Sequence, residues 1–352
     1  NRMFHTIMLN YVLTPNDFSA IFEDQKIYAR KNGAQFYRLK NTNTYISYAS
    51  SNDGVTWYLI SNSQSAPSRY YSIAARINPK VLLGNKDYIS VARTEDIELI
   101  GKKFDKRSTS ISKWLPYFND YNLKRVDYCI NIDVSNIGIP SEKMMDLICK
   151  ADKPPRFDIW EVYDKKSHRK KPGDGSLYLL NDSLHINCYP KKVQLERKFP
   201  DCPGIEEAES VIRFEVQCLY PKIINIKKTM EFTDNILFNM LSSDTSMKYI
   251  SKYYGMTIGY EPYYTLKLAC EAVLQSGYKD KTKEGMIKTL QLINSKRGIW
   301  KARESLFSDK DIRYFNKSLK RIRSLGINPV TIPNSYGVET LPNLIDKIKE
   351  QF

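Results

Sequence analysis

The sequence predicts an α+β protein in which a sheet-rich first part is followed by a mostly helical second part. Short runs of β-branched and aromatic residues, separated by polar turns, recur through residues 1–222. Beyond about residue 222 the apolar residues fall at helical spacing between polar connections. A chain of 352 residues is long for a single small core. We therefore expect two domains, residues 1–222 and 223–352.

The expected strands of the first part are short. They include "TYISYA", "VTWYLIS", "RYYSIAARI" and "YISVA", and the opening "NRMFHTIMLNYVL" is more typical of a strand than of a secretory signal. Residues 95–122 are more helical, and Gly101 and Pro116 favour two short helices over one. A further helix is expected over residues 141–150. The second part should contain helices over residues 234–242, 245–254, 265–276, 283–294 and 308–325.

Charge and cysteine content limit the class of protein. The net charge of +15 and the pI near 9.3 favour a polyanionic partner, although an ordinary enzyme that happens to be basic is the alternative. The six cysteines are scattered without a CxxC pair, which argues against a zinc ribbon or a disulfide framework. Reduced thiols and the short apolar runs lead us to expect a cytoplasmic protein that does not span a membrane.

Three of the expected strands share one design, an apolar face and a polar face, when alternate residues are assigned to opposite sides. They are "RVDYCINIDV", "SLHINCY" and "VIRFEVQC". Their polar faces carry Arg125, Asp127, Cys129, Asn131, Asp133, Ser183, His185, Asn187, Tyr189, Arg213, Glu215 and Gln217. If the strands are neighbours in one antiparallel sheet, Asp127, His185, Glu215 and Tyr189 converge.

Two carboxylates and an imidazole suit Mg²⁺ or Mn²⁺. Such a metal polarises a scissile phosphate while a hydroxyl beside it attacks. The alternative is that these strands are half-exposed, with polar residues facing water, as antiparallel sheets often are. A lone strand histidine such as His185 is also more often structural than a ligand. Tyr189 is one of 25 tyrosines, so the convergence of three polar faces carries the hypothesis.

The same stretches resemble a known family. "RVDYCINIDV", "INCYPKKVQLE" and "VIRFEVQ", in this order, resemble the Arg-Ile-Asp, Tyr-x-Lys and Arg-Phe-Glu blocks of the phage gene II/gene X replication proteins. "RINPKVLLG" resembles a Pro-x-Lys-Val-Leu block of that family, and "RYFNKSLKRIRSLGINP" is similar to its C-terminal helical region. Staphylococcal-type plasmid initiators share the Asp, Tyr and Arg-Phe-Glu blocks more distantly. The resemblance rests on short motifs spread over about residues 4–333.

The resemblance implies rolling-circle replication. An initiator of this family binds a double-stranded origin, nicks one strand, keeps the 5′ end as a phosphotyrosyl ester and leaves a 3′-OH for polymerase. Residues 1–222 would form an antiparallel-sheet catalytic domain of the Rep/HUH-like nuclease type, and residues 223–352 a helical DNA-binding domain. The implied partners are origin DNA, the nicked single strand, and a host helicase and polymerase of the bacterial cell.

Carried over to this chain, the family pattern makes Tyr189 the nucleophile, with Lys191 or Lys192 near the phosphate. Asp127 and Glu215 would bind the metal. Related nucleases have a His-hydrophobic-His motif where this chain has "HIN" at 185–187. That departure weakens His185 as a ligand and moves metal binding towards Asp127, Glu215 and Asp133. Tyr178 and Tyr163 are competing candidates for the nucleophile.

Positive charge is concentrated in the second part of the chain. Between Lys281 and Arg323 there are 13 Lys and Arg residues against four Asp and Glu, a net charge of +9. "SDKD" at 308–311 should start a helix in which Tyr314, Leu319 and Ile322 make apolar contacts. Such a helix can lie along a DNA groove, and a solvated amphipathic helix is the alternative.

A second basic element, "KKSHRKK" at 165–171, could hold the nicked strand. His168 within it is expected to meet phosphate or water rather than a metal. The full set of expected DNA contacts is Lys165, Arg169, Lys170, Arg213, Lys301, Arg313, Lys317, Lys320 and Arg321. A conjugative relaxase with the same chemistry, and a non-catalytic DNA-binding regulator such as a repressor or partition factor, are the alternative functions.

Overall fold

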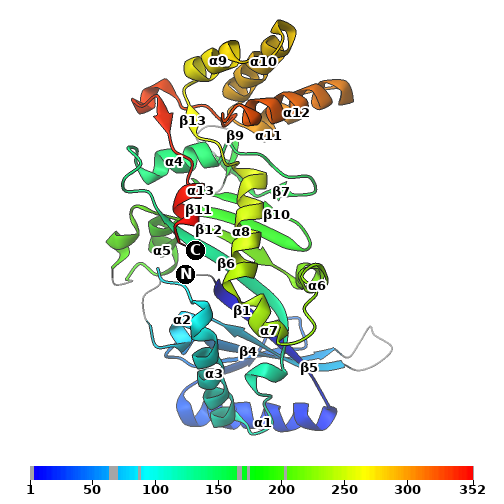
Figure 1. Ribbon diagram of the computed structural model, residues 1–352. Helices are drawn as coiled ribbons and strands as arrows, with labels where there is room; N and C mark the ends of the chain where they lie inside the picture. Colours follow the sequence, from blue (N-terminus) through cyan, green and yellow to red (C-terminus); the bar gives the residue numbers. More distant parts are fainter. Residues whose placement is uncertain are drawn as a thin grey trace. The chain divides into compact units, whose positions relative to one another are not determined.

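The computed structural model describes residues 4–62, 70–85, 89–164, 169–172, 175–201 and 204–351, with the backbone alone at 62, 162–164 and 169–172. The architecture is α+β, with a large antiparallel sheet and a mostly helical C-terminal region (Figure 1). The predicted fold class is confirmed. No helix among the described residues is long and apolar enough to cross a membrane.

The large sheet has ten strands in the order β2-β3-β4-β5-β1-β6-β12-β11-β10-β7. Their bounds are β1 (Phe4–Leu13), β2 (Gln35–Arg38), β3 (Thr44–Tyr48), β4 (Val55–Asn62), β5 (Tyr70–Ile77), β6 (Asn122–Asp133), β7 (Asp158–Ile159), β10 (Leu177–Leu180), β11 (Leu184–Pro190) and β12 (Val211–Cys218). The opening stretch is therefore a strand, as predicted. "YISVA" is not: in its described part it makes only an isolated bridge between Phe4 and Ala92.

The chain divides into two compact units, each discontinuous in sequence. The first comprises Asn1–Ile130, Asp182–Leu184 and Val216–Lys248, and the second Asn131–Asn181, His185–Glu215 and Tyr249–Phe352. Strands β6 and β12 contribute residues to both units. The boundary predicted near residue 222 marks a change of secondary structure rather than this division. It falls in α6 (Tyr220–Thr229), and the strands described after it, β13 (Tyr263–Tyr264) and β14 (Thr340–Leu341), have two residues each.

In the first unit, α1 (Pro15–Asn32) is an 18-residue helix in a region we expected to be strand-rich. The Thr14 side chain accepts a hydrogen bond from the Asp17 backbone N–H at 3.1 Å. Pro15 occupies the first turn, where a missing N–H costs nothing. Ile21, Gln25 and Ala29 recur every four residues and are buried. The strand prediction overlooked this cap and this spacing.

The helical region is interrupted around Pro116, between α3 (Ile97–Ile111) and a 3-10 helix at Phe118–Asp120, as predicted. α3 itself is continuous, so the predicted break at Gly101 is wrong. A Cβ atom at Gly101 would lie 3.2 Å from the ring of Phe118, so glycine lets this ring pack against the helix. Phe104, also on α3, contacts Trp57 of β4 with 5.2 Å between ring centroids. The packing of Phe118 and Trp57 against α3 offsets the roughly 1 kcal/mol by which glycine destabilises a helix interior relative to alanine. The unit also contains α2 (Pro79–Leu82) and α7 (Ile236–Met240).

In the second unit, four helices pack together: α9 (Leu266–Gln275), α10 (Asp280–Lys296), α11 (Ile299–Glu304) and α12 (Asp309–Ser324) (Figure 1). The core cluster of α9, α10 and α12 contains Ala269, Val273, Met286, Leu290 and Ile322, together with Ile327 after α12. α4 (Ser141–Ile148), α5 (Lys191–Lys198), α13 (Ile345–Lys349) and the hairpin of β8 (Glu161–Asp164) and β9 (Arg169–Pro172) belong to the same unit. α8 (Ser243–Thr257) begins in the first unit and ends in the second.

Candidate active site on the polar sheet face

The polar side of β12 is buried, and that of β6 is buried at its middle. Arg213 has 0% and Glu215 7% of its surface exposed, and Asp127 is also buried. The alternative in which these residues simply face water is wrong for Asp127, Arg213 and Glu215. Removing charged groups from water costs several kcal/mol each unless they are paired and hydrogen-bonded. The contacts they make therefore decide what they do.

In the first unit, Asp127 is held by two neighbours. The guanidinium of Arg125 donates from Nε to Asp127 Oδ1 and from a terminal nitrogen to Oδ2, both at 2.8 Å. Gln217 of β12 donates to Oδ2 from 3.4 Å. Both carboxylate oxygens are thus engaged, in the planar two-point geometry that arginine and carboxylates favour.

In the second unit, Tyr189 and Glu215 are brought together from adjacent strands. The phenol of Tyr189 donates to Glu215 Oε1 at 2.6 Å, and both side chains are buried. Arg213 lies beside this pair, with a terminal nitrogen 3.9 Å from Glu215 Oε1. Its Nε donates to Asn131 Oδ1 at 2.7 Å. Tyr189 therefore faces the polar network and not the apolar core.

Local sequence explains the position of Tyr189. Leu184, Ile186 and Cys188 of β11 are buried, while His185 and Asn187 between them are half-buried. Pro190 is the last residue of β11 and the N-cap of α5. Because proline has no backbone N–H, it suits the end of a strand. The strand therefore stops one residue after the phenol.

The two lysines after Pro190 differ in their surroundings. Lys191, 2% exposed, donates to Gln194 Oε1 at 2.7 Å. Lys192 is paired at the surface with Glu206 at 2.5 Å and Glu209 at 3.6 Å. The hydrogen bond to Glu206 raises the pKa of Lys192. The charge of Lys192 is therefore already paired with two surface acids.

Aromatic rings adjoin Tyr189. Tyr178 of β10 stacks on it with 6.4 Å between centroids, and Trp160, directly after β7, packs edge-on against Tyr178 at 5.5 Å. Sequence reasoning considered Tyr178 as a rival nucleophile and missed Trp160. The signal in the sequence was the position of Trp160, a few residues before the basic stretch at 165–171. The side chain of Tyr163 lies outside the described residues.

His185 and Asp133, the other two expected metal ligands, lie on β11 and at the end of β6. His185 of β11 is half-buried and pairs across the sheet with Leu180 of β10. Asp133 is exposed at the end of β6 and accepts hydrogen bonds from the backbone N–H of Ser135 at 2.9 Å and its hydroxyl at 3.0 Å. The backbone hydrogen bond from Ser135 lowers the pKa of Asp133. In this arrangement Asp133 stabilises a turn.

The described residues contain no group of three or more His, Cys, Asp and Glu side chains placed to hold a metal ion. The Asp127 carboxylate is occupied by Arg125, and Glu215 accepts from Tyr189. Carboxylate oxygens suit Mg²⁺ and Mn²⁺ chemically. As they lie, however, these residues do not form a ready metal site, and the metal requirement stays a prediction.

The predicted basic helix is present as α12. Ser308 caps it by accepting from the Asp311 backbone N–H at 3.1 Å, as the "SDKD" stretch predicts. Tyr314 was expected to make apolar contacts but is exposed, and the neighbouring Phe315 is buried instead. The difference is one position, or about 100° around a helix.

The expected DNA contacts vary in exposure. Arg313, Lys317 and Lys320 are exposed, and Arg321 is half-buried over the ring of Tyr278. Lys301 is half-buried over Trp300, while Arg213 is wholly buried beside Asn131. Lys165 lies outside the described residues, and Arg169 and Lys170 are described by their backbone in β9.

A groove of about 550 Å³ lies between α10 and α12. It is lined by Lys281, Lys288, Lys317 and Arg321, against the single acid Asp311. Tyr314 and Phe315 supply aromatic rings to its wall. The excess of cations suits a polyanion such as the phosphate backbone of DNA.

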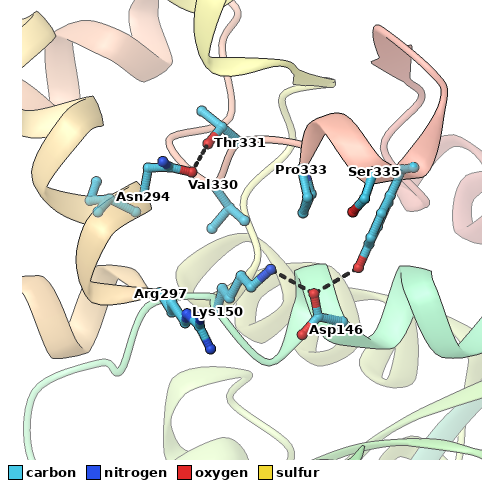
Figure 2. A pocket seen from close by; sticks show the side chains of 10 residues that line it. Asp146, Lys150, Asn294, Arg297, Val330, Thr331, Pro333 and Ser335 are labelled. Carbon is cyan, nitrogen blue, oxygen red and sulfur yellow. Dashed lines mark hydrogen bonds and ion pairs between the residues drawn. The ribbon is translucent and has the colours of Figure 1, made fainter.

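A second pocket, of about 360 Å³, lies between α4, α10 and residues 330–336 (Figure 2). Its Asp146 carboxylate accepts from Lys150 at 2.6 Å and from the Tyr336 phenol at 2.7 Å. Burial, and next the bond to Asp146, raise the pKa of Tyr336. The pocket contains none of the predicted catalytic residues. Its one carboxylate is already paired, so it is a weaker candidate for the reaction site.

Comparisons with known proteins add little. No family model matches the chain, and no curated protein matches it either. One solved structure, a rolling circle replication initiator protein from Geobacillus stearothermophilus, is similar with a TM-score of 0.33 and 10% identity, over 64% of this chain and 77% of that chain. A similarity this weak carries no argument about fold or function.

Proposed function

We propose that the protein initiates rolling-circle DNA replication by nicking one strand with Tyr189 and later rejoining it. The observation that carries the proposal is the 2.6 Å hydrogen bond from the Tyr189 phenol to Glu215. A phenol has a pKa near 10, so at neutral pH it needs a base to become a nucleophile. Glu215 is in position to act as that base.

In the proposed step, the Tyr189 oxygen forms a bond to the phosphorus of a phosphodiester while its proton passes to Glu215. The bond from phosphorus to the 3′ oxygen breaks, and that oxygen takes a proton from water and leaves as a 3′-hydroxyl. The protein then carries a 5′-phosphotyrosyl ester. Because a phenolate is a good leaving group, attack by a 3′-OH reverses the step and rejoins the strand.

Neighbouring cations support this chemistry. Arg213, buried 3.9 Å from Glu215, favours the ionised carboxylate that a base must be. Lys191 is the cation next to the end of β11 and is proposed to contact the phosphate. We further propose that Mg²⁺ or Mn²⁺ takes part, with Asp127, Glu215, His185 and Asp133 as the candidate ligands. When bound, such an ion polarises the scissile phosphate.

The basic face of α12 and the groove beside α10 are proposed to bind the duplex origin. Exposed Arg313, Lys317 and Lys320 can contact phosphates, which give affinity without reading sequence. A host helicase and polymerase would act on the opened strand in the bacterial cytoplasm. A conjugative relaxase would use the same residues, so the origin and partners distinguish the two.

The test uses single-stranded oligonucleotides tiled across the DNA element that carries the gene. Wild-type protein and the Tyr189→Phe variant are incubated with each oligonucleotide and Mn²⁺. We expect a covalent protein–DNA adduct that maps to the peptide containing Tyr189 and disappears in the variant. Tyr178→Phe is the matched control, because its ring stacks on Tyr189 but lies on the next strand. DNA binding without any adduct would instead favour a non-catalytic regulator.

A further inference from the structure

A row of three aromatic rings leads from the sheet edge to the Tyr189 phenol. Trp160 follows the edge strand β7 and is 42% exposed. Tyr178 on β10 is half-buried, and Tyr189 on β11 is buried. Exposure therefore falls steadily along the row towards the hydrogen bond with Glu215.

The contacts fix these rings on one side of the sheet. The Trp160 backbone N–H donates to the Tyr178 carbonyl at 2.9 Å, so the two residues face each other across the strands. Their ring centroids lie 5.5 Å apart, and those of Tyr178 and Tyr189 lie 6.4 Å apart. Packing against Tyr178 holds Trp160 in place, although much of its own surface remains open to solvent.

We infer that Trp160 stacks on an unpaired base of the DNA strand and so positions the scissile phosphate at Tyr189. This inference rests on the proposed function and adds a positioning residue to it. Every base has an apolar face that stacks on an indole, whatever its sequence. Strand β8 starts at Glu161, directly after Trp160. The sequence that follows, "KKSHRKK" at 165–171, is strongly basic, a composition that suits the phosphate backbone of a DNA strand.

Trp114 provides a matched control. It is 49% exposed, has Lys113 over its ring, and belongs to the other unit. The remaining tryptophans, Trp57 and Trp300, are buried.

The experiment measures the binding of two fluorescein-labelled oligomers of equal length, an oligothymidylate and an abasic oligomer. The full-length protein carries Tyr189→Phe, so that no strand is cut. We expect Trp160→Ala to weaken binding of the oligothymidylate by about 5- to 150-fold, the range that stacking of one base on an aromatic side chain spans. Binding of the abasic oligomer should not change. Trp160→Phe keeps a ring and should retain most of the affinity, which also guards against a folding defect in the alanine variant.

Equal affinity of Trp160→Ala and Trp114→Ala for the oligothymidylate would overturn the inference. So would an equal loss on the abasic oligomer, because that loss does not involve a base. The adduct assay with Tyr189 intact is independent of this result. Adduct formation with no Trp160 effect rejects the stacking role alone, whereas stacking without an adduct rejects the nicking reaction.

Discussion

Replacing Glu215 with Gln tests the centre of the proposed site. The two side chains have nearly the same size, so the change removes charge and basicity with little change in packing. Glu215 accepts the Tyr189 phenol at 2.6 Å and lies 3.9 Å from a buried Arg213 nitrogen. The attraction to Arg213 depends on the negative charge, and the phenol donates a stronger hydrogen bond to a carboxylate than to an amide oxygen.

The magnitude follows from these two contacts. A hydrogen bond to a charged acceptor contributes about 1.5–3 kcal/mol. Opposite charges about 4 Å apart attract by roughly 4 kcal/mol at an effective dielectric constant near 20. Most of that attraction is cancelled, because the neutral amide is not penalised for leaving water as the carboxylate is. We expect Glu215→Gln to lower the free energy of unfolding by about 2 kcal/mol.

Two measurements follow. Urea unfolding of wild type, Tyr189→Phe, Glu215→Gln and the double variant forms a double-mutant cycle, in which we expect a coupling of about 1–2 kcal/mol. Adduct formation under single-turnover conditions should slow by about 100- to 10,000-fold in Glu215→Gln, the range for loss of a general base. Binding of uncut DNA should be unchanged.

A coupling indistinguishable from zero would show that the charge of Glu215 does not strengthen the hydrogen bond from the phenol in solution. A wild-type rate of adduct formation in Glu215→Gln would show that Glu215 is not the base, even if the coupling is present. Either result refutes the reasoning that assigns the phenol its role from this hydrogen bond.

Further predictions follow from the surrounding residues. Lys191→Met should slow adduct formation at least tenfold, whereas Lys192→Met should change it less than twofold, because the surface acids already pair Lys192. EDTA should abolish adduct formation and Mn²⁺ restore it; full activity in EDTA would reject the metal. Arg313, Lys317 and Lys320 are the exposed cations of α12. Replacing them with neutral residues should reduce the slope of log K for DNA binding against log salt concentration by about 0.9 for each phosphate contact that is lost. An unchanged slope would contradict a DNA-binding role for this face of the helix. The pKa of Asp133 is lowered in the folded state from its ordinary 3.8, so its contribution to stability is present above pH 3.8 and lost as the pH falls below it. The stability difference between wild type and Asp133→Asn should therefore shrink under acid, and urea titrations at pH 6 and pH 3 check this.

Local signals in the sequence determined several features correctly. Alternation of polar and apolar residues predicted the strands that became β6, β11 and β12 and their two-faced character. The Ser308 cap predicted where α12 begins. Each of these signals lies within a few residues of the feature it specifies. The sequence predicts a helix break at Gly101, but α3 continues through it. The glycine makes room for the ring of Phe118, a residue 17 positions further along the chain, so the local sequence alone did not explain it.

Strand order, in contrast, was decided by the tertiary structure. β12 lies between β6 and β11 although it comes last of the three in the sequence. That order puts Glu215 against Tyr189 and Arg213 against Asn131. The row of Trp160, Tyr178 and Tyr189 likewise comes from three segments that no local spacing connects.

The physical reason is the range of the interactions. Which residues share a strand face depends on a repeat of two along one short segment, so the sequence alone determines that Tyr189, His185 and Asn187 point one way. Which strands become neighbours depends on the burial of apolar surface over the whole unit and on pairing between distant segments. Only the folded chain decides that the phenol of Tyr189 meets a carboxylate, and that this network of charges lies buried.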